Sequence, residues 1–212
     1  MKKYFLGIIT FLSITLLTSA AYSAAGISFM YVDSDTSGTE SEKSGDVGPE
    51  VSAEKTVSEK FYGASVFVEG QLGGVTVGLD YVPLDIELGS GSRTDTASDT
   101  NESTNDAGTY KASADLEDLL TLYVNVPVGP GYLLGGIHHV NITTSETLPN
   151  STYGDKSVFG YQVGAGIKGD RLSIEAFYSD FESITLNSTS GSSKVSADAD
   201  AMGIKVKATF GG

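Results

Sequence analysis

Two adjacent histidines, His138 and His139, are the residues of this chain best suited to acid–base chemistry. A histidine activates a serine or threonine hydroxyl when the two groups lie within hydrogen-bond reach and a third group orients the imidazole. The sequence contains many hydroxyl groups, but no His-x-Ser arrangement places one beside either histidine. Successive residues of a strand point to opposite faces, so we expect one histidine inside the protein and one outside. We therefore predict that the chain is not an enzyme.

A short acidic motif imitates the start of a calcium-binding loop. In the stretch Asp33-Ser34-Asp35-Thr36-Ser37-Gly38, oxygen ligands stand first, third and fifth, and glycine stands sixth. The twelfth position is Ser44, whereas such loops end in a bidentate glutamate. We predict no cofactor and no specific metal site, and we expect at most loosely bound divalent cations at the acidic loops.

Polar residues also occur at alternate positions that would face the inside of a barrel. Burying an unpaired charge is costly, so the carboxylates and ammonium groups among them should pair. Glu175 and Lys205 fall at similar depth on neighbouring segments, which predicts a salt bridge between them. We expect this network to plug the lumen, and a gate that opens when the charges re-pair is the alternative. The seven residues are Glu69, Asp80, Asn125, Gln162, Glu175, Lys205 and Lys207.

Eight strands are needed to position these residues. The connections between alternating segments are long and short in turn: the long ones cover 34–58, 88–115, 144–157 and 180–197, and the short ones 71–74, 129–131 and 168–170. Outer-membrane barrels have strands of about 9–11 residues, tight turns on the periplasmic side and long loops outside. We predict an all-β, eight-stranded antiparallel up-and-down transmembrane β-barrel with short periplasmic turns and long extracellular loops. The Ser-, Thr-, Gly- and Asp-rich long connections should be mobile.

The alternation assigns each strand a lipid face and a lumen face. In the last strand, Met202, Ile204 and Val206 share one face, and Lys205 and Lys207 share the other. The first two strands, 25–32 and 61–70, are apolar on both faces, so hydropathy alone does not separate their faces. The other residues that we assign to lipid are Ile27, Phe29, Tyr31, Tyr62, Ala64, Val66, Val68, Val75, Val77, Leu79, Tyr81, Leu120, Leu122, Val124, Val126, Val128, Phe159, Tyr161, Val163, Ala165, Ile167, Leu172, Ile174, Ala176, Tyr178, Ala208 and Phe210.

The amino terminus has the pattern of an export signal. Lys2 and Lys3 precede an apolar run over 4–17 and a small-residue stretch over 18–24. We predict a signal peptide over 1–23 and a single barrel domain over 24–212. The chain contains no cysteine, so closure of the sheet rather than disulfides must supply rigidity.

Acidic residues outnumber basic ones by 27 to 13, which gives a formal net charge of −14. Most of the acids fall in the long connections. Because binding of nucleic acid requires clustered Lys and Arg to neutralise phosphates, nucleic acid is excluded as a partner.

With these strands in view, the chain resembles the small outer-membrane barrels of the OmpA-transmembrane and OmpX kind, in the porin-like superfamily. The final strand carries much of the resemblance, because it is similar to the alternating sorting strand that ends in an aromatic residue in that family. Its key residues here are Gly203, Ile204, Val206, Ala208 and Phe210, although Gly211 and Gly212 follow the aromatic residue. The resemblance implies location in the outer membrane of a Gram-negative cell, contact with outer-membrane lipid, assembly by the barrel assembly machinery through this strand, and a monomer.

We predict a non-enzymatic protein of the cell envelope whose closed barrel displays loops for interactions at the surface. A narrow gated channel for small solutes or ions is one alternative. A soluble secreted barrel of the lipocalin type is the other, but it would need an apolar lumen and a polar exterior.

Overall fold

The computed structural model describes residues 23–42, 51–95, 108–147, 152–189 and 193–210. The predicted signal peptide lies outside the described residues except for Ser23, which begins the first strand. The strands are β1 (Ser23–Glu42), β2 (Val51–Leu72), β3 (Val75–Val82), β4 (Ile86–Asp95), β5 (Gly108–Val128), β6 (Gly131–Glu146), β7 (Lys156–Lys168), β8 (Leu172–Asn187) and β9 (Ser193–Phe210).

These strands close into an eight-stranded antiparallel barrel. Each strand from β5 to β9 pairs with the next, β9 pairs with β1, and β1, β2 and β3 follow in order. The pairing of β3 with β5 closes the ring, and β4 continues β3 along the same neighbour, β5. β3 and β4 are therefore two parts of one barrel strand, and the predicted all-β, eight-stranded antiparallel barrel is confirmed.

Three short turns lie at one end of the barrel, which we call the turn end; the opposite end is the hairpin end. Gly73 and Gly74 form a two-residue turn in which both φ angles are positive, 59° and 89°. Gly129 has φ 58° and precedes Pro130, and this combination suits the first central position of a tight hairpin turn. Glycine adopts these conformations without a steric penalty, so the local sequence fixes these turns.

The expectation of loops throughout the long connections is wrong for the residues that the structure describes. β1 continues to Glu42, β2 begins at Val51, and β9 begins at Ser193. β4 likewise occupies part of the stretch 88–115. A Ser- and Thr-rich segment can continue as a strand where neighbouring strands supply hydrogen-bond partners and one of its faces packs against buried apolar side chains. The segments 43–50, 96–107, 148–151 and 190–192 lie outside the described residues.

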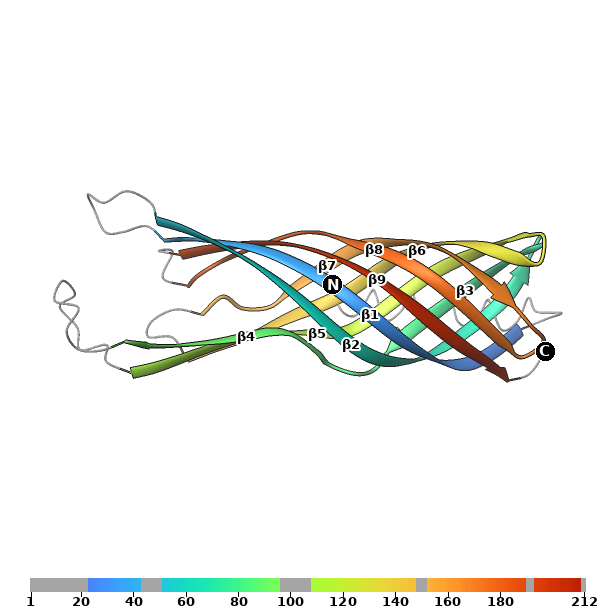
Figure 1. The fold of residues 1–212 in the computed structure, drawn as a ribbon, viewed down its shortest axis with the longest axis horizontal. Helices are drawn as coiled ribbons and strands as arrows, with labels where there is room; N and C mark the ends of the chain where they lie inside the picture. The colour runs from blue at the N-terminus through green and yellow to red at the C-terminus, as the bar shows by residue number, and fades with distance from the viewer. Residues whose placement is uncertain (1–22, 43–50, 96–107, 148–151, 190–192, 211–212) are drawn as a thin grey trace.

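Toward the hairpin end, the barrel divides into two four-stranded sheets. The β2–β3 ladder ends at the pair Val66–Tyr81, and the β7–β8 ladder ends at Gly160–Phe181. Past these pairs, the described part of β2 is paired with β1 alone, and that of β7 with β6 alone. We call the sheet of β2, β1, β9 and β8 leaf A, the sheet of β4, β5, β6 and β7 leaf B, and the two unpaired lines between them the seams. Figure 1 shows the leaves separating toward the end opposite the C-terminus.

Strand irregularities occur near the level at which the barrel divides. Pro83 lies between β3 and β4 and has no N–H to give to a ladder. Bulges interrupt the β5–β6 ladder between Glu117 and Leu120 and the β8–β9 ladder between Phe181 and Ile184. Bulges bend a strand and increase its twist, so these positions allow the closed barrel to open into two leaves.

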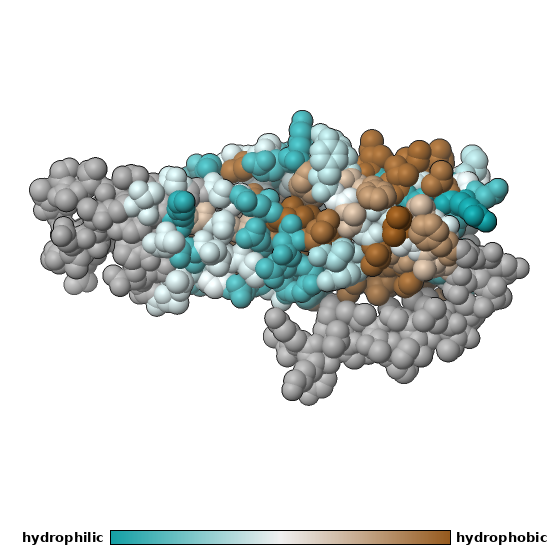
Figure 2. Space-filling view, turned by 90° about the horizontal axis from the view of Figure 1, so that it is seen from below, coloured by the Kyte–Doolittle hydropathy of each residue, from teal (hydrophilic) through white to brown (hydrophobic). Residues whose placement is uncertain are grey.

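The outer surface of the turn half is an apolar belt. Large apolar side chains such as Phe29, Val126, Ile137, Ile167 and Ile204 are exposed on it. Figure 2 shows most of the apolar residues gathered at this end and mainly polar residues, with a few apolar ones, over the rest of the coloured face. The prediction that apolar side chains of the alternating strands point outward is therefore correct in the turn half. Among the residues described, no helix is long and apolar enough to cross a membrane.

Buried apolar side chains fill the space between the two leaves, and we call them the apolar layer. They belong to one cluster and are buried or partly buried. Leaf A contributes Val32, Phe61, Phe181, Ile184, Leu186 and Ala201, and leaf B contributes Ile86, Leu88, Leu116, Leu119, Val140, Ile142 and Val158. The charged groups of the interior are thus confined to the turn half, where they lie among aromatic and aliphatic side chains, whereas apolar side chains dominate the interior of the hairpin half.

Candidate functional site: the barrel interior

Aromatic side chains line the wall of the polar half because each one lies across a glycine of the neighbouring strand. A Cβ built at any of these glycines would overlap the ring, so only glycine allows the ring to lie flat there. The space near the barrel axis is left to charged side chains. The pairs are Phe67 on Gly26, Tyr123 on Gly78, Tyr132 on Gly166 and Phe177 on Gly203.

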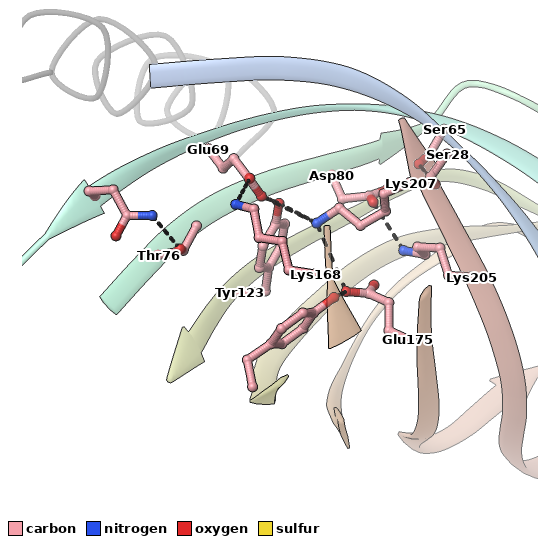
Figure 3. A network of polar contacts seen from close by, with 12 residues as sticks. Ser28, Ser65, Glu69, Thr76, Asp80, Tyr123, Lys168, Glu175, Lys205 and Lys207 are labelled. Atoms are coloured by element: carbon pink, nitrogen blue, oxygen red, sulfur yellow. Dashed lines mark hydrogen bonds and ion pairs between the residues drawn. The ribbon is translucent and has the colours of Figure 1, made fainter. Parts of the chain in front are cut away.

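Lys207 is the centre of the first polar group (Figure 3). Its Nζ lies 4.4 Å from the ring centroid of Phe67 and 4.3 Å from that of Tyr123. It donates to the Tyr123 hydroxyl at 2.9 Å and to Glu69 Oε2 at 3.4 Å. Glu175 Oε2 is 4.0 Å from the same ammonium group. Two carboxylates and two aromatic faces therefore replace the water that this buried cation has lost.

Glu69 connects this group to the turn end of the barrel. The Tyr123 hydroxyl donates to Glu69 Oε2 at 3.1 Å, and Lys168 Nζ donates to Glu69 Oε1 at 3.1 Å. The Lys168 side chain is 46% exposed, whereas that of Glu69 is 7% exposed. Lys168 thus reaches inward from the rim, and the sequence analysis did not identify it as part of the network.

Lys205 and Asp80 form a second buried ion pair across the lumen. Lys205 Nζ donates to Asp80 Oδ2 at 3.0 Å, and the two side chains are 6% and 2% exposed. Lys205 also lies 5.7 Å from the ring centroid of Phe177. Removal of either partner would leave an uncompensated buried charge.

The predicted salt bridge between Glu175 and Lys205 does not form. The two residues are opposite each other in the β8–β9 ladder, as their depth suggested. However, Lys205 reaches across to Asp80, and Glu175 accepts a hydrogen bond of 2.7 Å from the Tyr132 hydroxyl. Long side chains that project into a narrow lumen can meet partners from several strands, so adjacency in the ladder does not determine the pairing.

All seven residues proposed for the lumen are buried in the barrel interior. The structure brings Glu69, Glu175 and Lys207 together in one group, and Asp80 and Lys205 in another. Asn125 and Gln162 are buried on the same inward faces of β5 and β7.

His138 is the inward histidine, and it lies where the polar half meets the apolar layer. Its Nδ1 is 2.8 Å from Thr121 Oγ1, and its Nε2 is 2.9 Å from Ser179 Oγ. Its ring stacks on Phe181, with centroids 5.4 Å apart. A serine hydroxyl therefore lies beside a histidine, which the sequence pattern did not reveal, but the group on the other nitrogen is a hydroxyl and not a carboxylate. Both His138 and Ser179 are 3% exposed.

His139 points outward. Its ring meets that of Phe159 edge to face, with centroids 5.0 Å apart. This orientation follows from the alternation of faces along β6, as the adjacency of the two histidines predicted.

The motif at 33–38 is not a calcium loop. It lies within β1 and pairs with β2 on one side and β9 on the other. An extended strand cannot wrap its carboxylates around one ion as the compact loop does. Within the described residues, no group of three His, Cys, Asp or Glu side chains could hold a metal ion.

The proposed sorting strand is β9, which lies between β8 and β1. Ile204, Val206 and Phe210 are exposed on the apolar belt, while Gly203 accommodates the ring of Phe177. Ala208 is opposite Ile27 and Leu172 in the two ladders. Gly211 and Gly212 lie outside the described residues.

The sequence analysis missed the apolar layer. Its signal was nevertheless present, because two pairs of apolar residues, Ile86 with Leu88 and Ile184 with Leu186, occur at the edge of or inside stretches assigned to loops. Apolar residues two apart within a polar stretch are typical of a strand with one covered face.

No family model matches this chain, and no curated protein matches it. Some solved structures are similar in outline. One is the attachment invasion locus protein Ail of Yersinia pestis in complex with the heparin analogue sucrose octasulfate. It is 13% identical over 86% of this chain and 98% of that one, with a TM-score of 0.40. Neisserial surface protein A is 13% identical over 84% of this chain and 96% of that one, with a TM-score of 0.36. The outer-membrane protease OmpT from Escherichia coli is 10% identical over 91% and 98%, with a TM-score of 0.47.

These similarities concern the fold and not the function. The closed ring of eight antiparallel strands, the apolar belt outside and the charged lumen inside are features of this chain's own structure. The chain therefore folds as a closed eight-stranded antiparallel β-barrel with an apolar belt outside and charged groups inside.

Proposed function

We propose that the protein is a non-enzymatic integral protein of the outer membrane that keeps its lumen closed and presents its hairpin end to the outside of the cell. The observation that supports this proposal best is the inverted distribution of polarity. Ile204 and Val206 are exposed, whereas Lys205 and Lys207 between and beside them are buried. Such an arrangement is stable only if lipid covers the outside, because apolar surface of this extent is unfavourable in water.

The experiment is fractionation of the cell envelope combined with gel migration before and after heating. We expect the protein in the outer-membrane fraction, with a band that shifts on boiling because the closed barrel resists detergent. Recovery in the soluble fraction, without a heat-dependent shift, would overturn the proposal.

Contact with lipid, assembly through β9 and function as a monomer belong to the same proposal. The belt supplies the lipid-facing surface, and the exposed aromatic ring of Phe210 closes the described part of β9. Signal cleavage after residue 23 and a barrel domain over 24–212 complete the proposed organisation of the chain.

Interactions at the surface are the proposed work of the hairpin end. Asp35, Asp200 and Asp180 are directly opposite one another on β1, β9 and β8. Like charges in such a row repel, so loosely held divalent cations are a proposed partner of this end. No nucleic acid is proposed as a partner.

A narrow gated channel is the second candidate function, because the turn half of the lumen is polar and charged. The lipocalin alternative is disfavoured, since an apolar ligand would not be accommodated among Glu69, Asp80, Lys205 and Lys207.

A further inference from the structure

The two leaves of the hairpin half are joined mainly by side chains. Within each leaf, continuous ladders connect the strands, but past Val66–Tyr81 and Gly160–Phe181 the described strands have no ladder across either seam. At the β7–β8 seam, Thr189 N donates to Thr152 O at 2.9 Å, and the two Oγ1 atoms are 3.3 Å apart. The leaves could therefore separate without breaking any ladder of the barrel.

The apolar layer lies across the path that an ion would take. Below it, the lumen offers charged and hydroxyl groups up to the level of His138. At the next level of the wall, Val140 of β6 is opposite Val158 of β7, and both side chains are 1% exposed. Hydrophobic constrictions stop ions by excluding water, even where charged groups lie nearby.

We propose that the hairpin half is a two-leaf gate: the apolar layer between leaf A and leaf B seals the lumen, and separation of the leaves along the seams connects the polar lumen to the outside. This inference rests on the proposed placement in the membrane and deepens the second candidate function, the narrow gated channel. It assigns closure to the apolar layer, whereas the ion pairs of the turn half stabilise the barrel wall.

Hydroxyl substitution of the apolar layer tests the seal. We expect Val158→Thr and Val140→Thr, measured as the full chain in planar bilayers with potassium chloride, to open about ten times more often than the unaltered protein, because an unpaired buried hydroxyl destabilises the closed layer. The two side chains differ little in volume, so the barrel should still form. Val163→Thr, on the exposed lipid face of β7, is the matched control and should leave the opening frequency unchanged.

A disulfide across one seam tests the motion of the leaves. The chain has no cysteine of its own, and the touching side chains of Thr152 and Thr189 suit a disulfide in the double variant Thr152→Cys/Thr189→Cys. In the Val158→Thr background, we expect oxidation to suppress the openings and reduction to restore them. The control is Thr185→Cys/Ser196→Cys, whose Oγ atoms lie 3.1 Å apart within leaf A, and its oxidation should have no effect.

Three results would overturn the two-leaf gate. Openings of Val158→Thr and Val140→Thr that stay at the unaltered frequency would show that the layer is not the seal. Openings that persist with the seam disulfide closed would show that the leaves do not part there. Openings produced equally by Lys205→Met would assign closure to the ion pairs. Heat-dependent gel migration of each variant, together with envelope fractionation, separates these results from a failure of the membrane placement itself.

Discussion

At the scale of the residue, buried ion pairs dominate the polar half of the lumen. Asp80 and Lys205 are nearly inaccessible to solvent and lie on β3 and β9, so the pair ties together two strands that do not adjoin in the barrel. Such a pair contributes little net stability relative to apolar residues, but a single partner left alone is strongly unfavourable.

This asymmetry leads to a prediction for the Asp80–Lys205 pair. Lys205→Met and Asp80→Leu should each lower the free energy of unfolding by about 3–5 kcal/mol, and the double variant should lose less than the larger single loss. Urea unfolding of the protein in lipid vesicles measures the three values. Losses that simply add in the double variant would show that the two groups do not interact.

Glycines beneath aromatic rings are a second feature at the scale of the residue, because no larger residue fits there. Gly78 lies under the ring of Tyr123, which in turn donates to Glu69 and accepts from Lys207. Gly135 has no atom within 4 Å of the position that its Cβ would take.

We therefore expect Gly78→Ala to destabilise the barrel by about 1–3 kcal/mol, because the methyl group would displace the ring and the hydrogen bonds that depend on it. Gly135→Ala is the matched control and should be neutral. The same unfolding measurement applies, and a neutral Gly78→Ala would mean that Tyr123 can move away without loss.

At the scale of the element, β9 passes through both environments of the molecule. Ile204 is exposed on the apolar belt, whereas Ser196 lies on the same face of the strand in the hairpin half, opposite Thr39 and Thr185. In the proposed membrane placement, lipid covers the first position and water covers the second, although the strand is continuous.

Placing a lysine at each position tests this difference. Ile204→Lys should lower the unfolding free energy by about 2–4 kcal/mol, because an ammonium group facing lipid is unfavourable. Ser196→Lys should change it little. Unfolding in vesicles compares the two, and equal effects would mean that the belt is not lipid-facing at Ile204.

At the scale of the whole molecule, charge is distributed unevenly. The chain has a net charge of −14, while the interior pairs Glu69, Asp80 and Glu175 with Lys168, Lys205 and Lys207. These paired charges balance one another, so they do not contribute to the excess of negative charge.

Added salt should stabilise the protein for this reason. We expect the thermal unfolding temperature in detergent to rise as sodium chloride increases from about 0.01 to 1 M, over which the screening length falls from about 30 to 3 Å. Lys205→Met should show the same salt dependence, because buried pairs are screened far less. An unfolding temperature that is constant or falls with salt would contradict this account of the surface charge.

The sequence by itself determined the number of barrel strands, the tight turns and the two faces of the strands in which apolar and polar residues alternate clearly. These properties are local: a period of two along each strand separates Ile204 from Lys205, and glycine pairs such as Gly73-Gly74 specify a turn. The inward direction of Glu175 followed from the same rule, but its partner did not.

Only the tertiary structure decided which side chains meet across the lumen and where the barrel divides. Lys205 meets Asp80 and not Glu175 because barrel stagger, which no single strand encodes, sets the relative heights of strands that lie apart in the chain. The two leaves exist for a similar reason. Ile86, Val158 and Ile184 become a buried layer only when three distant segments close over one another, so no single segment revealed the layer when it was considered alone.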